Sequence, residues 1–144
     1  MDWIEPVYDR TDEDVKYAKQ HPASAPTLKG AINFTDRARI ANNIHYLAEL
    51  LTSYGYPLAA YCKIDWTRDD KPYASTVQIM HDDIERIQTE FYRYKRTPIL
   101  SWNHYEKINE IERILFEIES TIADVVAAFQ HSGTFFSGME GIRV

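Results

Sequence analysis

The sequence has one cysteine, Cys62, among 144 residues, and only five glycines. A single thiol excludes an intramolecular disulfide and a zinc site built on several cysteines. No segment approaches the roughly 20 apolar residues that a membrane span needs. Asp2, Glu5 and Asp9 stand where a signal peptide needs basic residues and an apolar run. We therefore expect a protein with no membrane partner, retained in the cytoplasm unless it leaves within a larger particle.

Basic residues are also scarce, since 16 Lys and Arg stand against 22 Asp and Glu and leave a net charge of −6. Nucleic-acid-binding domains usually present a basic face, so this balance predicts no nucleic-acid partner. Hydrophobic residues make up 44% and charged residues 26%, which is typical of a globular domain and excludes a wholly disordered chain. The length fits a single domain with one core.

Aromatic residues are abundant, at 13% with ten tyrosines. One interpretation is a core and loops packed by tyrosine. The other is a protein–protein interface, where tyrosine and tryptophan are enriched. We expect both to hold in part.

Three segments carry the apolar spacing of a helix face, with steps of three and four. Their apolar positions are Ile40, Ile44, Leu47, Leu51 and Tyr54; Val77, Met80, Ile84, Ile87, Phe91 and Tyr94; and Ile108, Ile111, Leu115, Ile118, Ile122, Val125 and Phe129. Stripes this short need partners, so they predict an all-α fold in which three main helices form an antiparallel bundle over residues 35–131.

Helix boundaries are predicted from capping residues. Thr35, Ser75 and Asn103 are the expected N-caps of the three main helices, and Ser75 and Asn103 have Gln78 and Glu106 at the capping-box position. Gly55 is the expected C-terminal cap of the first of these helices.

The segments outside the bundle have their own signals. Residues 1–34 are expected to form an extended arm (1–10), a short helix that begins after Thr11, and a linker. Residues 58–64 are apolar and could form a short strand. Residues 132–144 contain three glycines and predict a tail of loop or small β structure.

No motif in the sequence indicates catalysis or a cofactor. His81, Asp82 and Asp83 are consecutive, so on a helix they point about 100° apart and cannot clasp one metal ion; they are interpreted as a solvated face. Cys62 lies in an apolar stretch, as an inert buried thiol does. We therefore predict no catalytic residues, no metal and no cofactor.

Charged residues on the helices are given structural roles. The acids of the last helix alternate with its apolar stripe and are interpreted as its solvent-exposed face; they are Glu110, Glu112, Glu117 and Glu119. The one basic cluster, residues 93–96, lies at a predicted helix C-terminus, where the helix dipole favours cations.

Several segments together carry a resemblance. They are Tyr8-Asp9-Arg10-Thr11 with Asp14-Val15; residues 28–36; residues 46–51 with Tyr54-Gly55-Tyr56; Asp65-Trp66-Thr67 with Asp69 or Asp70 and Pro72; residues 111–115; and Ser132-Gly133 with Ser137-Gly138. In order and spacing they resemble a family of small proteins and domains encoded among the tail genes of phages and prophages of Gram-positive bacteria.

The resemblance implies a place rather than a reaction. It implies a non-enzymatic structural component of a bacteriophage tail or phage-tail-like particle, in the baseplate, tail tip or fibre attachment. Its partners would be other tail or baseplate proteins or further copies of the chain, and it would be assembled in the host cytoplasm and end in the virion. The alternatives are a cytoplasmic helical adaptor or regulatory module and a metal-dependent hydrolase.

Aromatic and apolar side chains near the predicted helix starts and in the two terminal segments are the candidate interface. They are Trp3, Tyr8, Trp66, Trp102, Phe135, Phe136, Ile142 and Val144. For each tryptophan the alternative is that the ring staples a loop to the bundle.

Overall fold

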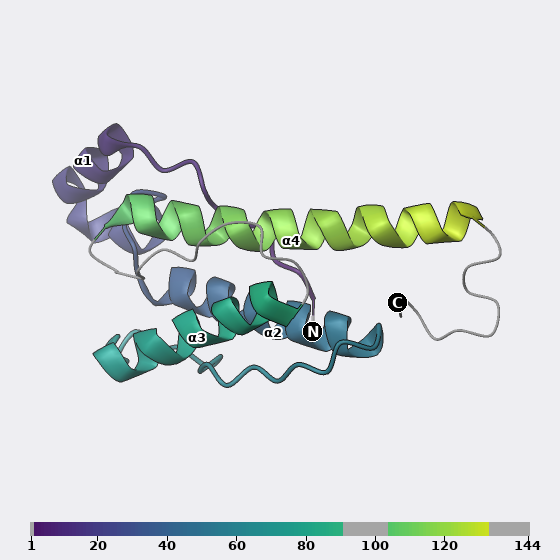
Figure 1. The fold of residues 1–144 in the computed structure, drawn as a ribbon. Helices are drawn as coiled ribbons and strands as arrows, with labels where there is room; N and C mark the ends of the chain where they lie inside the picture. Colours follow the sequence, from purple (N-terminus) through teal and green to yellow (C-terminus); the bar gives the residue numbers. More distant parts are fainter. Residues whose placement is uncertain (1, 91–103, 133–144) are drawn as a thin grey trace.

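The fold is all-α, as predicted, with a short N-terminal helix and three main helices (Figure 1). The computed structural model describes residues 2–90 and 104–132, and within these ranges it contains no β-strand. The elements are α1 (Asp12–Gln20), a 3-10 helix (Pro22–Thr27), α2 (Phe34–Ser53), α3 (Ala74–Glu90) and α4 (Tyr105–Ser132). The predicted tail beyond Ser132 lies outside the described residues.

The three main helices run in the same direction, so the predicted antiparallel arrangement is wrong (Figure 1). Early in both helices, Arg39 of α2 pairs with Glu112 of α4 at 2.7 Å. Late in both helices, Leu50 and Val126 line one groove. Residue numbers therefore rise together along α2 and α4, which makes these helices parallel.

The connection between α2 and α3, residues 54–73, runs back along α2 and so makes the parallel order possible. Leu58 hydrogen-bonds Thr52, and further along the connection the Cys62 carbonyl lies 2.7 Å from His45 Nε2. A helix of this length spans about 30 Å, which an extended chain covers in roughly ten residues. The connection is therefore long enough to join parallel helices, which the antiparallel prediction did not consider.

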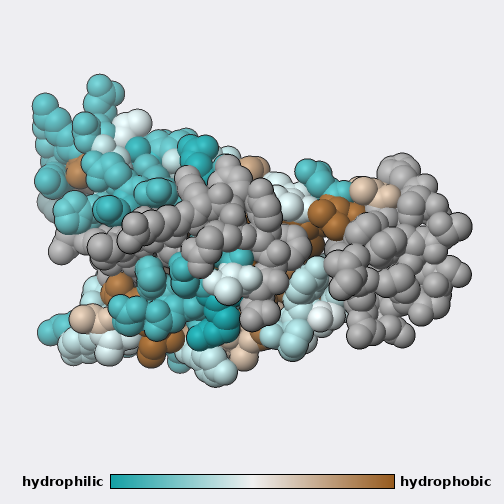
Figure 2. Space-filling view, in the orientation of Figure 1, coloured by the Kyte–Doolittle hydropathy of each residue, from teal (hydrophilic) through white to brown (hydrophobic). Residues whose placement is uncertain are grey.

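The predicted apolar stripes form the core where the structure describes them, except at Val125, which is only partly buried; its neighbour Val126 packs against the core instead. The fully buried large side chains are Ile40, Ile44, Leu47, Leu51, Met80, Ile84, Ile87, Ile108, Ile111, Ile114, Leu115 and Ile118. Val77 and Tyr54 pack against this core while remaining partly exposed. Phe91, Tyr94 and the Phe129 side chain lie outside the described residues. Figure 2 shows the outer surface, which is largely hydrophilic around α1.

The first two N-caps both use capping boxes. Thr11 caps α1 as predicted and exchanges hydrogen bonds with Asp14. α2 begins one residue before Thr35, because Asn33 is its N-cap and accepts from the Thr35 N–H at 2.9 Å. Asp36 closes this box by accepting the Asn33 N–H at 3.0 Å. The prediction of Thr35 as the cap was thus wrong by two residues.

The start of α3 also differs from its prediction. Ser75 lies inside the first turn, since α3 begins at the preceding residue. Gln78 donates to Asp82 at 2.8 Å instead of completing a capping box. In α4 the His104 carbonyl accepts the first helical hydrogen bonds, while the predicted cap Asn103 lies outside the described residues.

Gly55 ends α2 as predicted. Its φ of 96° is the left-handed conformation that favours glycine. The Tyr56 N–H then donates back to the Leu51 carbonyl at 2.9 Å, and the Gly55 N–H donates to the Thr52 carbonyl at 3.1 Å. This is a Schellman cap, and it turns the chain onto its return path along α2.

Replacing Gly30 by alanine is expected to lower the free energy of unfolding by about 1–3 kcal/mol. A Cβ at this position would lie 2.0 Å from the backbone oxygen of Asp14, so α1 would have to shift. Urea unfolding followed by circular dichroism measures the loss. Lys16→Ala is the control, because it changes an exposed position of α1 and should leave the midpoint nearly unchanged. An unchanged midpoint for Gly30→Ala would contradict the close approach of the loop to α1.

Candidate interaction surface

The N-terminal arm is extended, as predicted, but it is bound to its own bundle between α2 and α4. The Asn43 side chain accepts the Ile4 N–H at 3.0 Å and donates to the Ile4 carbonyl at 2.7 Å. Further along, the Val7 N–H donates to Glu112 at 3.1 Å. Side chains of α2 and α4 thus bond the N–H and carbonyl groups of the arm, as the backbone of a neighbouring strand would in a sheet. The arm was a candidate partner contact, and the structure shows that its backbone groups at Ile4 and Val7 bond within the chain.

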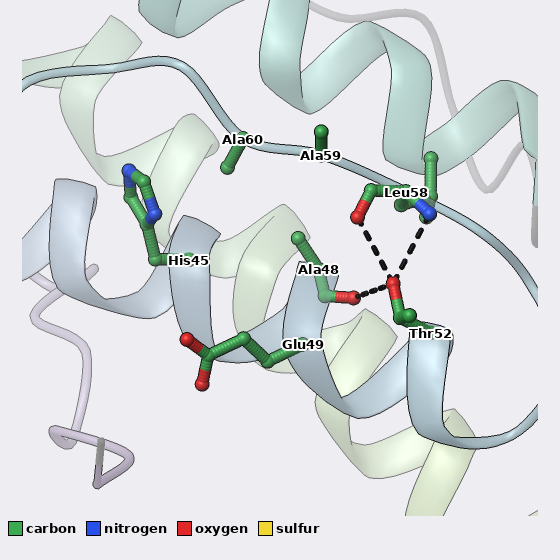
Figure 3. Close-up of a pocket in the computed structure, with 7 residues that line it drawn as sticks. All are labelled: His45, Ala48, Glu49, Thr52, Leu58, Ala59 and Ala60. Atoms are coloured by element: carbon green, nitrogen blue, oxygen red, sulfur yellow. Dashed lines mark hydrogen bonds between the residues drawn. The ribbon is translucent and has the colours of Figure 1, made fainter.

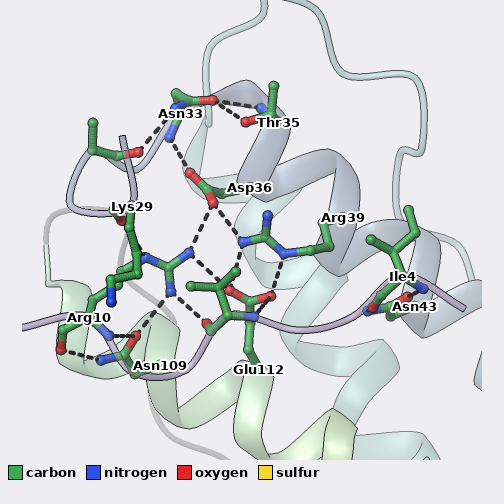
Figure 4. A network of polar contacts seen from close by, with 12 residues as sticks. Ile4, Arg10, Lys29, Asn33, Thr35, Asp36, Arg39, Asn43, Asn109 and Glu112 are labelled. Carbon is green, nitrogen blue, oxygen red and sulfur yellow. Dashed lines mark hydrogen bonds and ion pairs between the residues drawn. The ribbon is translucent and has the colours of Figure 1, made fainter. Parts of the chain in front are cut away.

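A buried polar cluster holds the end of the arm (Figure 4). The Arg10 guanidinium donates through Nη2 to Asp36 at 2.9 Å and to Glu112 at 3.0 Å. Arg39 contacts the same two carboxylates, with Nε 2.7 Å from Glu112 and Nη2 2.6 Å from Asp36. Two cations and two anions therefore alternate, and together they join the arm, α2 and α4.

The remaining donors of Arg10 are also satisfied. Nε donates to the Lys29 carbonyl at 3.1 Å, and Nη1 donates to the Val7 carbonyl at 2.8 Å and to Asn109 at 3.0 Å. Burial acts to lower the pKa of Arg39, but its hydrogen bonds and charge pairing with Glu112 and Asp36 outweigh burial and raise that pKa. Complete pairing of this kind is what allows charges to remain away from water.

The burial of Glu112 corrects the sequence analysis. This residue was assigned to the solvent-exposed face of its helix, and it is 0% exposed. Its neighbours Ile111 and Ile114 are buried as well. These apolar neighbours were the available signal that Glu112 is buried. The partners of its carboxylate are distant in the sequence, so the sequence could not identify them.

Asp83 corrects a second assignment, that of residues 81–83 to a solvated face. Asp83 is 2% exposed, and its Oδ2 accepts the backbone N–H groups of Tyr61 at 2.9 Å and Cys62 at 2.8 Å. Its Oδ1 accepts from Arg86 at 2.9 Å. The carboxylate therefore holds the connection against α3, and the possible strand at 58–64 is instead an irregular extended segment.

Trp66 serves as a staple, which is the alternative that the sequence left open. Its ring is in the core and the residue is 7% exposed. The indole Nε1 donates to the Lys63 carbonyl at 2.8 Å, and the Arg37 guanidinium lies 5.1 Å from the ring centre. In this conformation Trp66 has little surface to offer a partner.

Trp3 and Tyr8 also contact their own chain, although each remains partly exposed. Trp3 packs on Tyr46 with ring centres 5.5 Å apart. Tyr8 lies 5.4 Å from the ring of Phe116, with the guanidinium of Arg113 4.6 Å from its ring centre. Both rings attach the arm to the bundle. The other predicted contacts lie outside the described residues; they are Trp102, Phe135, Phe136, Ile142 and Val144.

Four exposed side chains that the sequence analysis did not single out lie on the connection or on α3. Tyr61 is 68% exposed, Tyr73 64%, Ile79 41% and Ile64 38%. We call them the Tyr61 surface. They lie on adjoining segments, because Asp83 of α3 accepts the Tyr61 N–H and Arg86 of α3 donates to the Ala59 carbonyl at 3.2 Å. Tyrosine is enriched at protein–protein interfaces, so this surface is a candidate contact.

The ring of Tyr61 is held in place although it is exposed. The Arg86 guanidinium lies 5.2 Å from its ring centre, and Arg86 is itself fixed by Asp83. An aromatic side chain that is ordered before binding loses less conformational entropy in a complex. The signal in the sequence was the apolar stretch 58–64, for which a short strand was left possible.

A groove of about 370 Å³ lies between α2 and the returning connection (Figure 3). Thr52 closes one end through hydrogen bonds to Leu58, and His45 and Glu49 also line it. His45 Nε2 is engaged with the Cys62 carbonyl. Among the described residues no three metal-ligating side chains come together, here or elsewhere.

No helix among residues 2–90 and 104–132 is both long enough and apolar enough to cross a membrane. Comparison with protein-family models, with curated proteins and with solved structures finds no significant match.

Replacing Arg10 by alanine is expected to lower the free energy of unfolding by about 3–5 kcal/mol, because it leaves buried carboxylates with one cation fewer. Urea unfolding measures the loss. The control is Lys29→Ala, which removes exposed ion pairs of 3.3 and 3.5 Å to Asp14 and Asp9 and should leave the midpoint near that of the unmodified chain. Equal effects of the two changes would contradict the central role of the cluster.

Cys62 is expected to react slowly with thiol reagents in the folded chain. The thiol is 4% exposed, and burial together with the charge of Asp83 raises its pKa above the ordinary value. At pH 8 a disulfide reagent should modify Cys62 in the folded chain at least about tenfold more slowly than in the urea-unfolded chain. A thiol introduced by Asp82→Cys on the exposed face of α3 is the control for reagent access. Similar rates at the two sites would contradict the burial of Cys62.

Proposed function

We propose that this protein is a non-enzymatic structural component of a bacteriophage tail or phage-tail-like particle, in the baseplate, tail tip or fibre attachment. It works by association with other tail proteins or with further copies of itself. The protein reaches the particle during assembly in the host cytoplasm.

The resemblance to proteins encoded among phage tail genes supports the proposal, because its segments meet in space. Residues 8–11, 28–36 and 111–115 contribute Arg10, Asp36 and Glu112 to the polar cluster. The features that carry the resemblance are therefore those that attach the arm to the bundle. Such features suit a small rigid part of an assembly.

The loop at residues 65–70 gives the same kind of support. Its tryptophan, Trp66, is buried, and Asp70 accepts the Thr67 N–H at 2.7 Å. These contacts fix the connection that presents the Tyr61 surface. A rigid scaffold with ordered exposed aromatics is suited to protein–protein association.

Mass spectrometry of purified phage or tail-like particles, induced from a strain that encodes the protein, tests the proposal directly. We expect the chain in stoichiometric amount relative to other tail proteins. A chain that is abundant in the lysate and missing from the particles would contradict the proposal and favour the cytoplasmic adaptor.

A second experiment tests the Tyr61 surface. The double variant Tyr61→Ser/Tyr73→Ser should fold normally, because both side chains are exposed, and its copy number in particles should fall about tenfold or more. Tyr17→Ser is the matched control, since Tyr17 is 52% exposed but lies on α1. Equal incorporation of the two variants would exclude this surface as the contact.

The metal-dependent alternative has its own test. A divalent cation that binds only the folded chain must raise the melting temperature. We expect no rise with magnesium or manganese in the full chain. A melting temperature that rises and then saturates as the cation concentration increases would show that the chain binds the metal, and would favour the metal-dependent alternative.

A further inference from the structure

The groove that holds the N-terminal arm continues beyond the start of the arm. Between the later turns of α2 and α4 there is an open stretch of about 260 Å³. Its lining residues are Tyr46, Leu50, Tyr54, Glu119, Ile122, Ala123, Val126 and Ala127. Trp3 packs on Tyr46 at the boundary, so the arm adjoins one end of this stretch.

The open stretch is suited to an apolar occupant. Figure 2 shows hydrophobic side chains gathered over the later half of α4. Ile122 is buried beneath it, and Leu50 and Val126 are partly exposed and packed against the core. The carboxyl of Glu119 is also drawn into this setting, since burial, with Glu5 and Asp124 nearby, raises its pKa. If only water covers this stretch, its apolar side chains stay exposed, which is unfavourable; an apolar segment that binds there removes them from water.

Two extended segments of the described structure, the arm and the α2–α3 connection, run antiparallel to the helices on which they lie. The arm passes along α2 from Asn43 to Asp36 as its own numbering rises. The connection passes along α2 from Thr52 to His45 in the same sense. An extended chain that runs opposite to α2 and α4 would continue this arrangement.

The sequence supplies such a segment directly after α4. Gly133 follows the last helical residue, as Gly55 follows the end of α2, and a glycine there permits a left-handed cap and a reversal of direction. Phe135 and Phe136 come next. In the reversal after α2, the aromatic Tyr56 follows the glycine and packs against the core.

The reach of the segment is sufficient. Along α4 the distance from Ser132 back to Ala127 is about 8 Å, and to Glu119 about 20 Å. The twelve residues 133–144 can extend over about 40 Å. Because the segment is tethered next to the groove, its effective concentration there is on the order of millimolar, which favours its own groove over that of another molecule.

We propose that the open groove between α2 and α4 binds the chain's own segment 133–144, which runs antiparallel to α4 with Phe135 and Phe136 as its apolar anchors. This inference does not depend on the proposed function. It assigns these two phenylalanines, predicted above as partner contacts, to a contact within the chain.

Disulfide trapping in the full chain tests the proposal. In a Cys62→Ala background, Ala123→Cys places a thiol in the groove and Ser137→Cys places one after the aromatic pair. The chain is equilibrated with a glutathione redox buffer, and mass spectrometry measures intrachain and interchain disulfides. We expect an intrachain bond whose effective molarity exceeds that of the control pair about tenfold or more.

The control pair is Asp124→Cys with Ser137→Cys, which moves the thiol about 100° around α4 at nearly the same tether length. Adding Phe135→Ser and Phe136→Ser to the groove pair should reduce its effective molarity to the control value, with unchanged helical circular dichroism. Equal effective molarities for the two original pairs would overturn the proposal. Preferential interchain disulfides between Ala123→Cys and Ser137→Cys would also overturn it and assign the groove to a second copy.

Discussion

The buried carboxylate of Glu112 is the contact on which the arrangement of this protein depends. It accepts hydrogen bonds from Arg10 and Val7 of the arm and from Arg39 of α2, while its own backbone belongs to α4. Burying a carboxylate is costly unless its partners are all in place, so the arm and the two helices must meet in one register. The cluster thereby couples the N-terminus to the core, and the arm becomes part of the fold rather than an appendage.

The parallel order of the three main helices explains why side chains bind so much backbone. Parallel helices that follow each other in the chain need a long connection between them. The α2–α3 connection lies along both helices on its way back. An extended segment without a strand partner still needs its N–H and carbonyl groups satisfied. Asn43, Asp83 and Thr52 do this from the helices, and each is polar on a surface that faces another segment. The arm and the α2–α3 connection are therefore hydrogen-bonded to the helices along which they lie.

The aromatic residues divide between the two roles that their abundance suggested. Trp3, Tyr8 and Trp66 attach extended segments to the bundle. Tyr61 and Tyr73 remain largely exposed on segments that the buried contacts hold in place. A scaffold that orders its exposed rings from beneath is well suited to multi-copy association, and this is the physical basis of the proposed role in a phage tail.

The sequence by itself determined the local features of this protein. The three- and four-residue spacing places Ile40, Met80 and Ile111 in the core, and the Thr11 and Gly55 caps are set by atoms within one helical turn. Only the tertiary structure decided the direction of the helices and the burial of Glu112 and Asp83. The cations that pair with Glu112, Arg10 on the arm and Arg39 on α2, lie 102 and 73 residues away in the sequence. A periodic pattern shows which face of a helix is apolar, but the burial of a charged group at the edge of that face depends on which distant segment packs there, because only that segment brings the compensating charge.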